Sequence, residues 1–307
     1  MTRSPRATRS DRADTLAWCT SGRGRATPRP WSCWRWWSEA IEAQFVAALV
    51  EYDGTDFAGF QLQRRGRTVQ GELEKGLARV VGSAVRVVAA GRTDAGVHAY
   101  GQVIHLRVAW SHDLADLQRA WNANLPRDVA VRAIARVPEG FHARFSARSR
   151  TYRYQINNEP VRSPLLARYT WHVRRPLDVG RMEEACTALL GRQDLAALGR
   201  PPSGESTVRE VLKAEAWAAG RLVFVEVEAD AFLQHMMRRL VAMAVEVGLG
   251  RLTVAGFADI IRARDPRGVP GMAPPNGLFL MSVRYDPEVL QWSLPSPETW
   301  QKESCFA

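Results

Sequence analysis

The stretch "AAGRTDAGVHAYGQVIHL" (residues 89–106) joins a glycine-flanked loop to a run of alternating apolar residues. Ile104, Leu106 and, just beyond the quoted stretch, Val108 recur at every second position, which predicts a strand with one buried face. The loop before this strand carries Asp94, with Arg92 two residues earlier. An aspartate in such a loop usually forms a turn with its own backbone, so a chemical role for Asp94 depends on the segments around it.

Helical and extended patterns follow one another irregularly on both sides of this strand. In the first half, strands are expected at residues 45–54, 84–90, 102–108 and 129–137, and helices at 68–82 and from residue 113. In the second half, strands are expected at 150–158 and 277–285, a hairpin at 211–229 around Ala219 and Gly220, and helices after Asp178, at 235–248 and at 254–264. Thr253 is expected to cap the last helix, and Gly248 to end the one before it.

This order of elements predicts an α+β protein with two α+β halves, at residues 45–147 and 148–288, whose mostly antiparallel sheets are flanked by helices. The pattern argues against a doubly wound parallel sheet because strands pair in hairpins and helices are too few for strict alternation. Basic residues of both halves are expected to line a cleft at their seam. Residues 1–44 read as a basic, Trp-containing N-terminal extension without fixed structure, and residues 289–307 as a loose tail.

The composition indicates a polyanionic partner. The formal charge is +10 and the isoelectric point is near 10.1. Lysine occurs only at positions 75, 213 and 302, so nearly all of the 42 basic residues are arginine. A GC-rich genome and selection for guanidinium groups that grip phosphates would both produce this bias.

Neither a membrane segment nor a metal site is expected. No stretch approaches the roughly 18 apolar residues of a membrane-spanning helix, and no secretory signal pattern begins the chain, so a cytoplasmic protein is expected. The histidines lack the spacing of a metal site. The cysteines are scattered and form no CxxC pair, so neither a zinc knuckle nor a disulfide framework is indicated; they are Cys19, Cys33, Cys186 and Cys305.

Four further segments contain residues that suit either chemistry or plain structure: "EYDGTDFAGFQLQ", "FHARFSARSRTYRYQI", "AFLQHMMRRLVAMAVEVG" and "APPNGLFLMSV". Taken singly, Asp53 and Asp56 favour turns. Arg238 and Arg239 would usually form a solvated helix face. Tyr152 and Tyr154 share one face of a strand and would pack across it.

Taken together, these segments resemble the tRNA pseudouridine synthase A family from about residue 46 to 286. "GRTDAGVHA" is the most specific motif, and "EYDGT.F.GFQ", "F.AR.SA..R.Y.Y" and "FL.HM.R" before "EVG" support it. The resemblance implies the pseudouridine synthase fold and the conversion of uridine to pseudouridine at positions 38, 39 and 40 of the tRNA anticodon stem-loop. It also implies a homodimer, and a reaction without cofactor or metal.

The resemblance also implies roles for five residues. Asp94 matches the catalytic aspartate, which acts as a nucleophile toward the ribose or the base. Arg92 matches an arginine that helps to extrude the target nucleotide, and Tyr152 the tyrosine that stacks on the flipped uracil and assists proton transfer. Arg238 matches the basic partner of the catalytic carboxylate, and Leu278 an apolar wall of the pocket.

Some positions depart from the family pattern. Where the family often has "R-N-I-V-G", this chain has Arg239, Leu240, Val241 and Ala242 after Arg238, and "GRQDLAAL" replaces a frequent "G.HDF..F". Two other hypotheses stay open at this point. A non-catalytic RNA-binding protein or tRNA chaperone could keep the same fold, and a glycosidase would need a second acid near Asp94.

Overall fold

A computed structural model describes residues 42–292 except 202, 203 and 205. The described residues belong to one compact unit. The predicted N-terminal extension, apart from residues 42–44, and the predicted tail from residue 293 onward lie outside the described part, as do Cys19, Cys33 and Cys305. Within the described part, no helix is long and apolar enough to cross a membrane.

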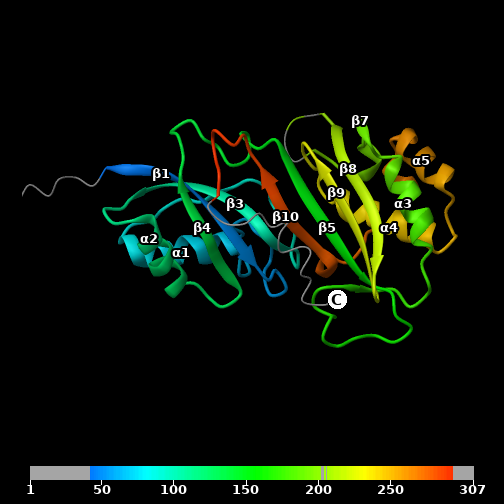
Figure 1. Cartoon of the computed structure of the whole chain (residues 1–307), viewed down its shortest axis with the longest axis horizontal. Coiled ribbons are helices and arrows are strands. Elements are labelled where there is room, and N and C mark those ends of the chain that lie inside the picture. Colours follow the sequence, from blue (N-terminus) through cyan, green and yellow to red (C-terminus); the bar gives the residue numbers. More distant parts are fainter. Residues whose placement is uncertain (1–41, 202–203, 205, 293–307) are drawn as a thin grey trace, which may run out of the picture. The chain divides into compact units, whose positions relative to one another are not determined.

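Strands and helices alternate irregularly along the chain (Figure 1). In the described residues the strands are β1 (Ala43–Tyr52), β2 (Val88–Ala89), β3 (His98–Ala109), β4 (Val129–Arg136), β5 (Ser149–Asn157), β6 (Trp171–His172), β7 (Gly191–Asp194), β8 (Val208–Ala219), β9 (Leu222–Ala229) and β10 (Leu278–Arg284). The helices are α1 (Val69–Val81), α2 (Leu114–Ala123), α3 (Val179–Thr187), α4 (Met236–Gly248) and α5 (Val254–Ala263), with short 3₁₀ turns η1 (Ala196–Leu198), η2 (Pro266–Gly268) and η3 (Pro275–Gly277). The predicted α+β class is confirmed.

One sheet runs through both predicted halves. Its strand order is β4-β1-β3-β10-β5-β9-β8-β7, with β2 beside β3 and β6 beside β5. The last described strand, β10, lies in the middle, where it pairs in parallel with β3 and antiparallel with β5 (Figure 1). The predicted division near residue 147 falls between β4 and β5, and it stays a prediction.

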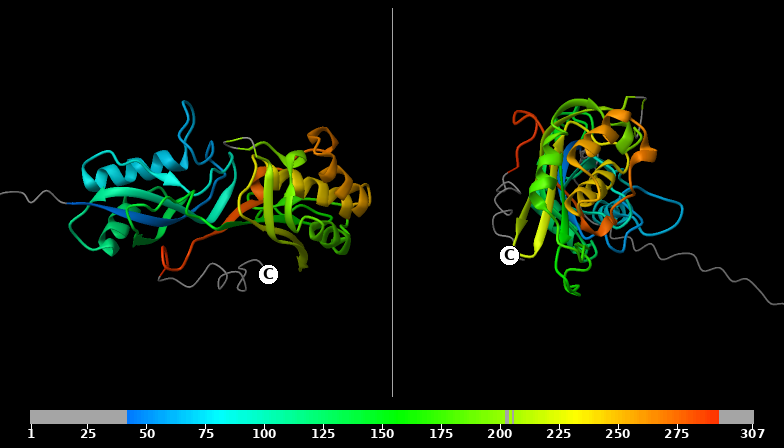
Figure 2. Two further views of the ribbon diagram at one scale, coloured as in Figure 1. Left: turned by 90° about the horizontal axis from the view of Figure 1, so that it is seen from above. Right: turned by 90° about the vertical axis from the view of Figure 1, so that its right-hand side faces the viewer.

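The helices of both halves lie on the same side of this sheet (Figure 2). In the first half, Trp121 of α2 is fully buried, and its indole nitrogen donates to the carbonyl of Leu73 in α1 at 3.0 Å. In the second half, α3 packs against β8 and against α4 and α5. The helices bury their apolar faces against the sheet or against one another, as the residue spacing predicts.

Local signals in the sequence mark several element ends correctly. The side chains of Asp178 and Thr253 accept hydrogen bonds from backbone amides at the starts of α3 and α5, so both are N-caps. Helix α4 ends at Gly248, and the β8–β9 hairpin turns between Ala219 and Leu222.

The predicted strand at 84–90 is wrong for most of its length, because only Val88 and Ala89 join the sheet. Side chains of α1 take over the backbone groups of Val87: Glu74 accepts from its amide at 3.0 Å and Gln70 donates to its carbonyl at 3.1 Å. The segment is therefore satisfied without a strand partner.

Candidate active site

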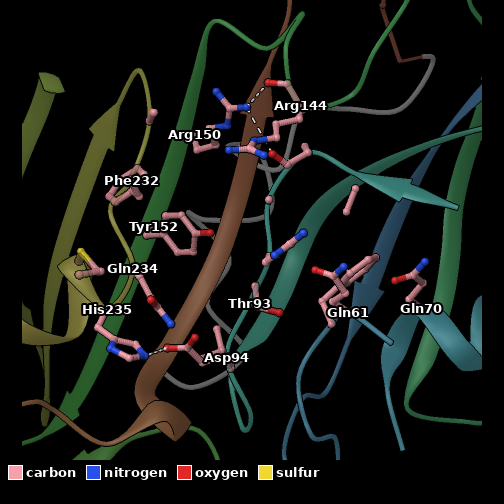
Figure 3. A pocket seen from close by; sticks show the side chains of 18 of the residues that line it. Gln61, Gln70, Thr93, Asp94, Arg144, Arg150, Tyr152, Phe232, Gln234 and His235 are labelled. Atoms are coloured by element: carbon pink, nitrogen blue, oxygen red, sulfur yellow. Dashed lines mark hydrogen bonds and ion pairs between the residues drawn. The ribbon is translucent and has the colours of Figure 1, made fainter. Parts of the chain in front are cut away.

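A pocket of about 840 Å³ opens beside the central strands, and segments from both halves line it (Figure 3). All five residues singled out in the sequence border this pocket; they are Arg92, Asp94, Tyr152, Arg238 and Leu278. Six arginines line it, namely Arg86, Arg92, Arg144, Arg150, Arg209 and Arg238. Asp94 is the single acid among the described lining residues, so the predicted basic cleft is present.

In the loop that carries Asp94, the backbone and the side chain of this residue have different roles. The Asp94 carbonyl accepts from the Val97 amide at 3.2 Å and closes a turn. Gly96 follows with a φ of 77°, in the left-handed region where glycine is favoured. The Asp94 carboxylate takes no part in the turn and faces the pocket, where it is about one-third exposed (34%). Asp94 is therefore not the ordinary turn residue that its context alone suggests.

The end of β1 and the segment that follows it contact the Asp94 loop directly. The Tyr52 hydroxyl and the Thr93 hydroxyl lie 2.7 Å apart, and the Phe60 amide donates to the Thr93 carbonyl at 3.1 Å. A Cβ atom at Gly54 would lie 1.9 Å from the Val97 carbonyl oxygen, so only glycine allows this close approach. The "EYDGT.F.GFQ" motif thus packs directly against the Asp94 loop.

Asp53 in the same motif forms a turn, as predicted. Its carboxylate accepts from the amide and the hydroxyl of Thr55 at 3.0 and 2.6 Å. It also accepts from the Tyr169 hydroxyl at 2.9 Å and lies 3.1 Å from the ring nitrogen of the buried His98. Asp53 therefore ties the start of β3 to the chain around Tyr169.

Two basic side chains at the start of α4 face the Asp94 carboxylate. Arg238 Nη1 lies 3.3 Å and His235 Nε2 3.5 Å from Asp94 Oδ2 (Figure 3 draws the second contact). The Nε of Arg238 donates to the Ala273 carbonyl at 2.8 Å, which fixes the guanidinium between the two oxygens. Only 13% of the Arg238 side chain is exposed, so a solvated helix face is the wrong interpretation for this residue.

Tyr152 projects from β5 toward the pocket. Its ring meets that of Phe232 edge to face, with centroids 4.7 Å apart. Burial raises the pKa of Tyr152 to about 12; the charge of Arg150 acts against this shift and that of Asp94 adds to it. The phenol is therefore protonated at neutral pH. Tyr154 on the same strand donates to the Pro274 carbonyl at 2.7 Å and is structural, as the packing interpretation predicts.

The last two residues singled out in the sequence are Leu278, which is buried, and Arg92, which is exposed. Leu278 begins β10 opposite Tyr154 and is 5% exposed, which makes it an apolar wall. Arg92 is exposed. Among the described residues, none forms an ion pair or hydrogen bond with its guanidinium, so this side chain is available to a ligand.

Two residues of the site were not singled out from the sequence. Arg150 is nearly buried, and its guanidinium donates to the carbonyls of Ala90 and Asp230 at 3.3 and 2.7 Å and to that of Arg144. It thereby ties the approach to the Asp94 loop to two other loops. His235 is the second residue. Both residues are fixed positions of the quoted family motifs, so the motifs could have identified them as site residues. Their contacts with distant segments cannot be predicted from a local pattern.

The described residues contain no group of three or more His, Cys, Asp or Glu side chains that could hold a metal ion. The groups available for chemistry in the pocket are a carboxylate, guanidinium groups, two imidazoles and a phenol. Such a set suits nucleophilic attack and proton transfer on a polyanionic substrate. Together with the α+β sheet, this pocket has the features of an enzyme that acts on a polyanionic substrate.

Comparison with known proteins narrows this class. The sequence profile of the tRNA pseudouridine synthase family matches residues 48–146 and 185–286. The chain is 45% identical over 245 residues to tRNA pseudouridine synthase A of Roseiflexus castenholzii, covering 78% of this chain and 90% of that protein. It is 43% identical over 256 residues to the enzyme of the same name from Chloroflexus aurantiacus, covering 82% and 92%. The chain belongs to the tRNA pseudouridine synthase family, which confirms the resemblance.

Proposed function

We propose that this protein converts uridine to pseudouridine in tRNA, with Asp94 as the nucleophile. One observation carries the assignment of Asp94: it is the single carboxylate among the described residues of a pocket lined by six arginines, and Arg238 and His235 face it. Its family membership supplies the reaction. The absence of a second acid in this lining argues against a glycosidase that uses paired carboxylates.

The reaction is an isomerisation, so every atom of the uridine is retained. The bond between N1 of uracil and C1′ of ribose breaks, the base turns, and a bond forms between C5 and C1′. C5 loses a proton and N1 gains one. Asp94 supplies a carboxylate oxygen that bonds transiently to the ribose or the base and then leaves as a carboxylate.

The residues around Asp94 suit these steps. A base must leave its stack before the glycosidic bond can be reached, which costs a few kcal/mol. The exposed guanidinium of Arg92 is placed to grip the backbone as the nucleotide is extruded. The ring of Tyr152 offers a surface for the uracil, and base–aromatic stacking contributes roughly 1 to 3 kcal/mol. The protonated phenol can donate a hydrogen bond to the base edge while the base turns.

Arg238 has a separate part in this proposal. Closure of RNA over the pocket displaces water from Asp94, and a lone carboxylate loses hydration in such a site. The ion pair with Arg238 replaces part of that hydration. Because Ala273 holds Nε of the same guanidinium, the carboxylate keeps its direction during the reaction.

The target and the assembly are part of the same proposal. The target uridines lie at positions 38, 39 and 40 of the anticodon stem-loop, and a homodimer clasps one tRNA. The family resemblance supports both statements. The excess of arginine in the pocket lining supports a phosphate-bearing substrate, for which binding weakens steeply as salt rises.

The test uses purified protein and an unmodified tRNA with uridines in the anticodon stem-loop, followed by chemical mapping of pseudouridine. Wild type should convert uridines at positions 38 to 40, and Asp94→Asn should not. Asp113→Asn removes an exposed carboxylate outside the pocket and should convert them like wild type. Tight binding without conversion by wild type would favour a tRNA chaperone, and release of free uracil would favour a glycosidase.

A further inference from the structure

A second hollow, of about 270 Å³, adjoins the active-site pocket. Gln234 and His235 line both cavities, so they form the wall between them. The second hollow is also bordered by Arg200, which follows η1, and by Arg239 of α4. A strand of RNA that places a uridine against Asp94 can therefore continue over His235 into the second hollow.

The positive charge of this hollow has no partner among the residues that the structure describes. Neither Arg200 nor Arg239 forms an ion pair or a side-chain hydrogen bond with any described residue. Two acids that are near the lining residues in sequence pair with other arginines. Asp194, two residues before η1, pairs with Arg264 at 3.3 Å, and Asp265, just before η2, pairs with Arg267 at 2.7 Å. Within the described part of the chain, the hollow thus has two guanidinium groups without an ion-pair partner and no acid in its lining.

The wall between the two cavities is held in place by the backbone. The Gln234 amide donates to the Arg200 carbonyl at 2.8 Å. A Cβ atom at Gly199 would lie 2.3 Å from the Gln234 carbonyl oxygen, so the two segments touch. His235 has a φ of 64°, which is uncommon for a residue with a side chain, and its ring reaches Asp94 from this conformation. The position of the hollow relative to Asp94 is therefore set before RNA binds.

We propose that the second hollow binds a backbone phosphate of the tRNA strand next to the flipped uridine, through Arg200 and Arg239. This inference rests on the proposed function. Guanidinium groups match phosphate oxygens with two parallel hydrogen bonds, and most contacts in protein–nucleic acid complexes go to phosphate and sugar. Arg239 stands where the family pattern often has asparagine, so this contact adds a charge that the pattern does not require.

The test compares tRNA binding in the Asp94→Asn background, where the reaction is expected not to proceed. The probe is the same unmodified tRNA, and affinity is measured at several salt concentrations. The double variant Arg200→Gln with Arg239→Gln should weaken binding roughly tenfold and reduce the slope of log affinity against log salt by about 0.7, the value for one lost phosphate contact on a single strand.

A matched pair of substitutions controls for total charge. Arg251→Gln with Arg262→Gln removes two arginines that pair with Glu246 and Asp259 and lie outside both cavities. This pair should leave the slope within a few tenths of the parent value. An unchanged slope in the Arg200 and Arg239 variant, or an equal change in the control, would overturn the inference.

A second measurement identifies which phosphate of the tRNA the two arginines contact. A methylphosphonate linkage is placed, one position at a time, on either side of the target uridine in the anticodon stem-loop. At one of these positions, the methylphosphonate should weaken binding about tenfold in the protein with both arginines and less than twofold in the variant that lacks them. Equal sensitivity of both proteins at every linkage would exclude the phosphate contact.

The two proposals fail in different ways. If wild type makes pseudouridine while neither the salt dependence nor the methylphosphonate effect depends on the two arginines, the phosphate site is wrong and the enzyme assignment stands. If binding depends on Arg200 and Arg239 while wild type leaves every uridine unchanged, the enzyme assignment fails and an RNA-binding site remains.

Discussion

The floor and the rim of the active-site pocket are built in opposite ways. The floor consists of Asp94, Tyr152, Arg238 and Leu278, and ion pairs, ring contacts or tight packing hold each of them. The rim includes Leu62 and Phe145, which are 41% and 74% exposed, although the Phe145 ring also contacts His142 and Arg144. It also includes Arg92, whose guanidinium has no partner among the described residues. The difference suits a site that preorganises the reacting groups and leaves the groups that meet a large substrate free to adapt.

The largest expected effect comes from breaking the floor at Arg238. Arg238→Gln should reduce turnover by roughly 10² to 10³, because removal of one partner of a desolvated charge pair costs about 2 to 5 kcal/mol. Arg238→Lys keeps the charge but cannot form the same fork, so it should recover only part of the rate. Single-turnover kinetics at saturating tRNA measures this loss. A rate near that of wild type for Arg238→Gln would show that Asp94 acts without this partner.

The second prediction concerns Gly54, which packs against the loop that carries Asp94. Gly54→Ala places a methyl group against the Val97 carbonyl and should lower the free energy of unfolding by about 2 to 4 kcal/mol while displacing the Asp94 loop. Gly140→Ala is the control, since a Cβ there would meet nothing within 4 Å. Urea denaturation and turnover are measured together. Equal stability of the two variants would contradict the close approach.

The rim should respond in binding and not in stability. Phe145→Ala should weaken tRNA binding about tenfold, because one lost base–aromatic stack is worth roughly 1 to 3 kcal/mol. Its melting temperature should hardly change, since the side chain is mostly exposed. Leu165→Ala, which removes another exposed apolar side chain outside the pocket, serves as the control. A marked loss of stability in Phe145→Ala would mean that the rim is part of the core.

The smallest effect concerns the protonation of Tyr152. Its pKa is raised to about 12, so unfolded chains release this proton near pH 10 while folded chains keep it. The corresponding stability is fully present below about pH 10 and is lost as pH rises toward 12. Urea denaturation across this range should show a steeper loss for wild type than for Tyr152→Phe. Parallel curves would mean that the folded phenol titrates normally.

Much of the fold and the site could be predicted from the sequence because the signals are local. Apolar spacing marked β1, α1, β5 and α4, and capping side chains marked the starts of α3 and α5. The prediction failed at residues 84–90, where Gln70 and Glu74 satisfy the backbone of Val87. There, two side chains of a neighbouring helix form the hydrogen bonds that a strand partner would otherwise form. No local sequence pattern indicates such contacts.

The sequence by itself determined the α+β class, the basic character and, through the family motifs, the five residues gathered at the pocket. Periodicity, caps and motifs act over a few residues, so they can be seen in the chain before it folds. The tertiary structure alone decided that β10 joins β3 to β5, that Arg150 ties three loops, and that Arg239 borders a second hollow with Arg200. These features depend on which distant segments meet, and that is settled only when the whole core packs together.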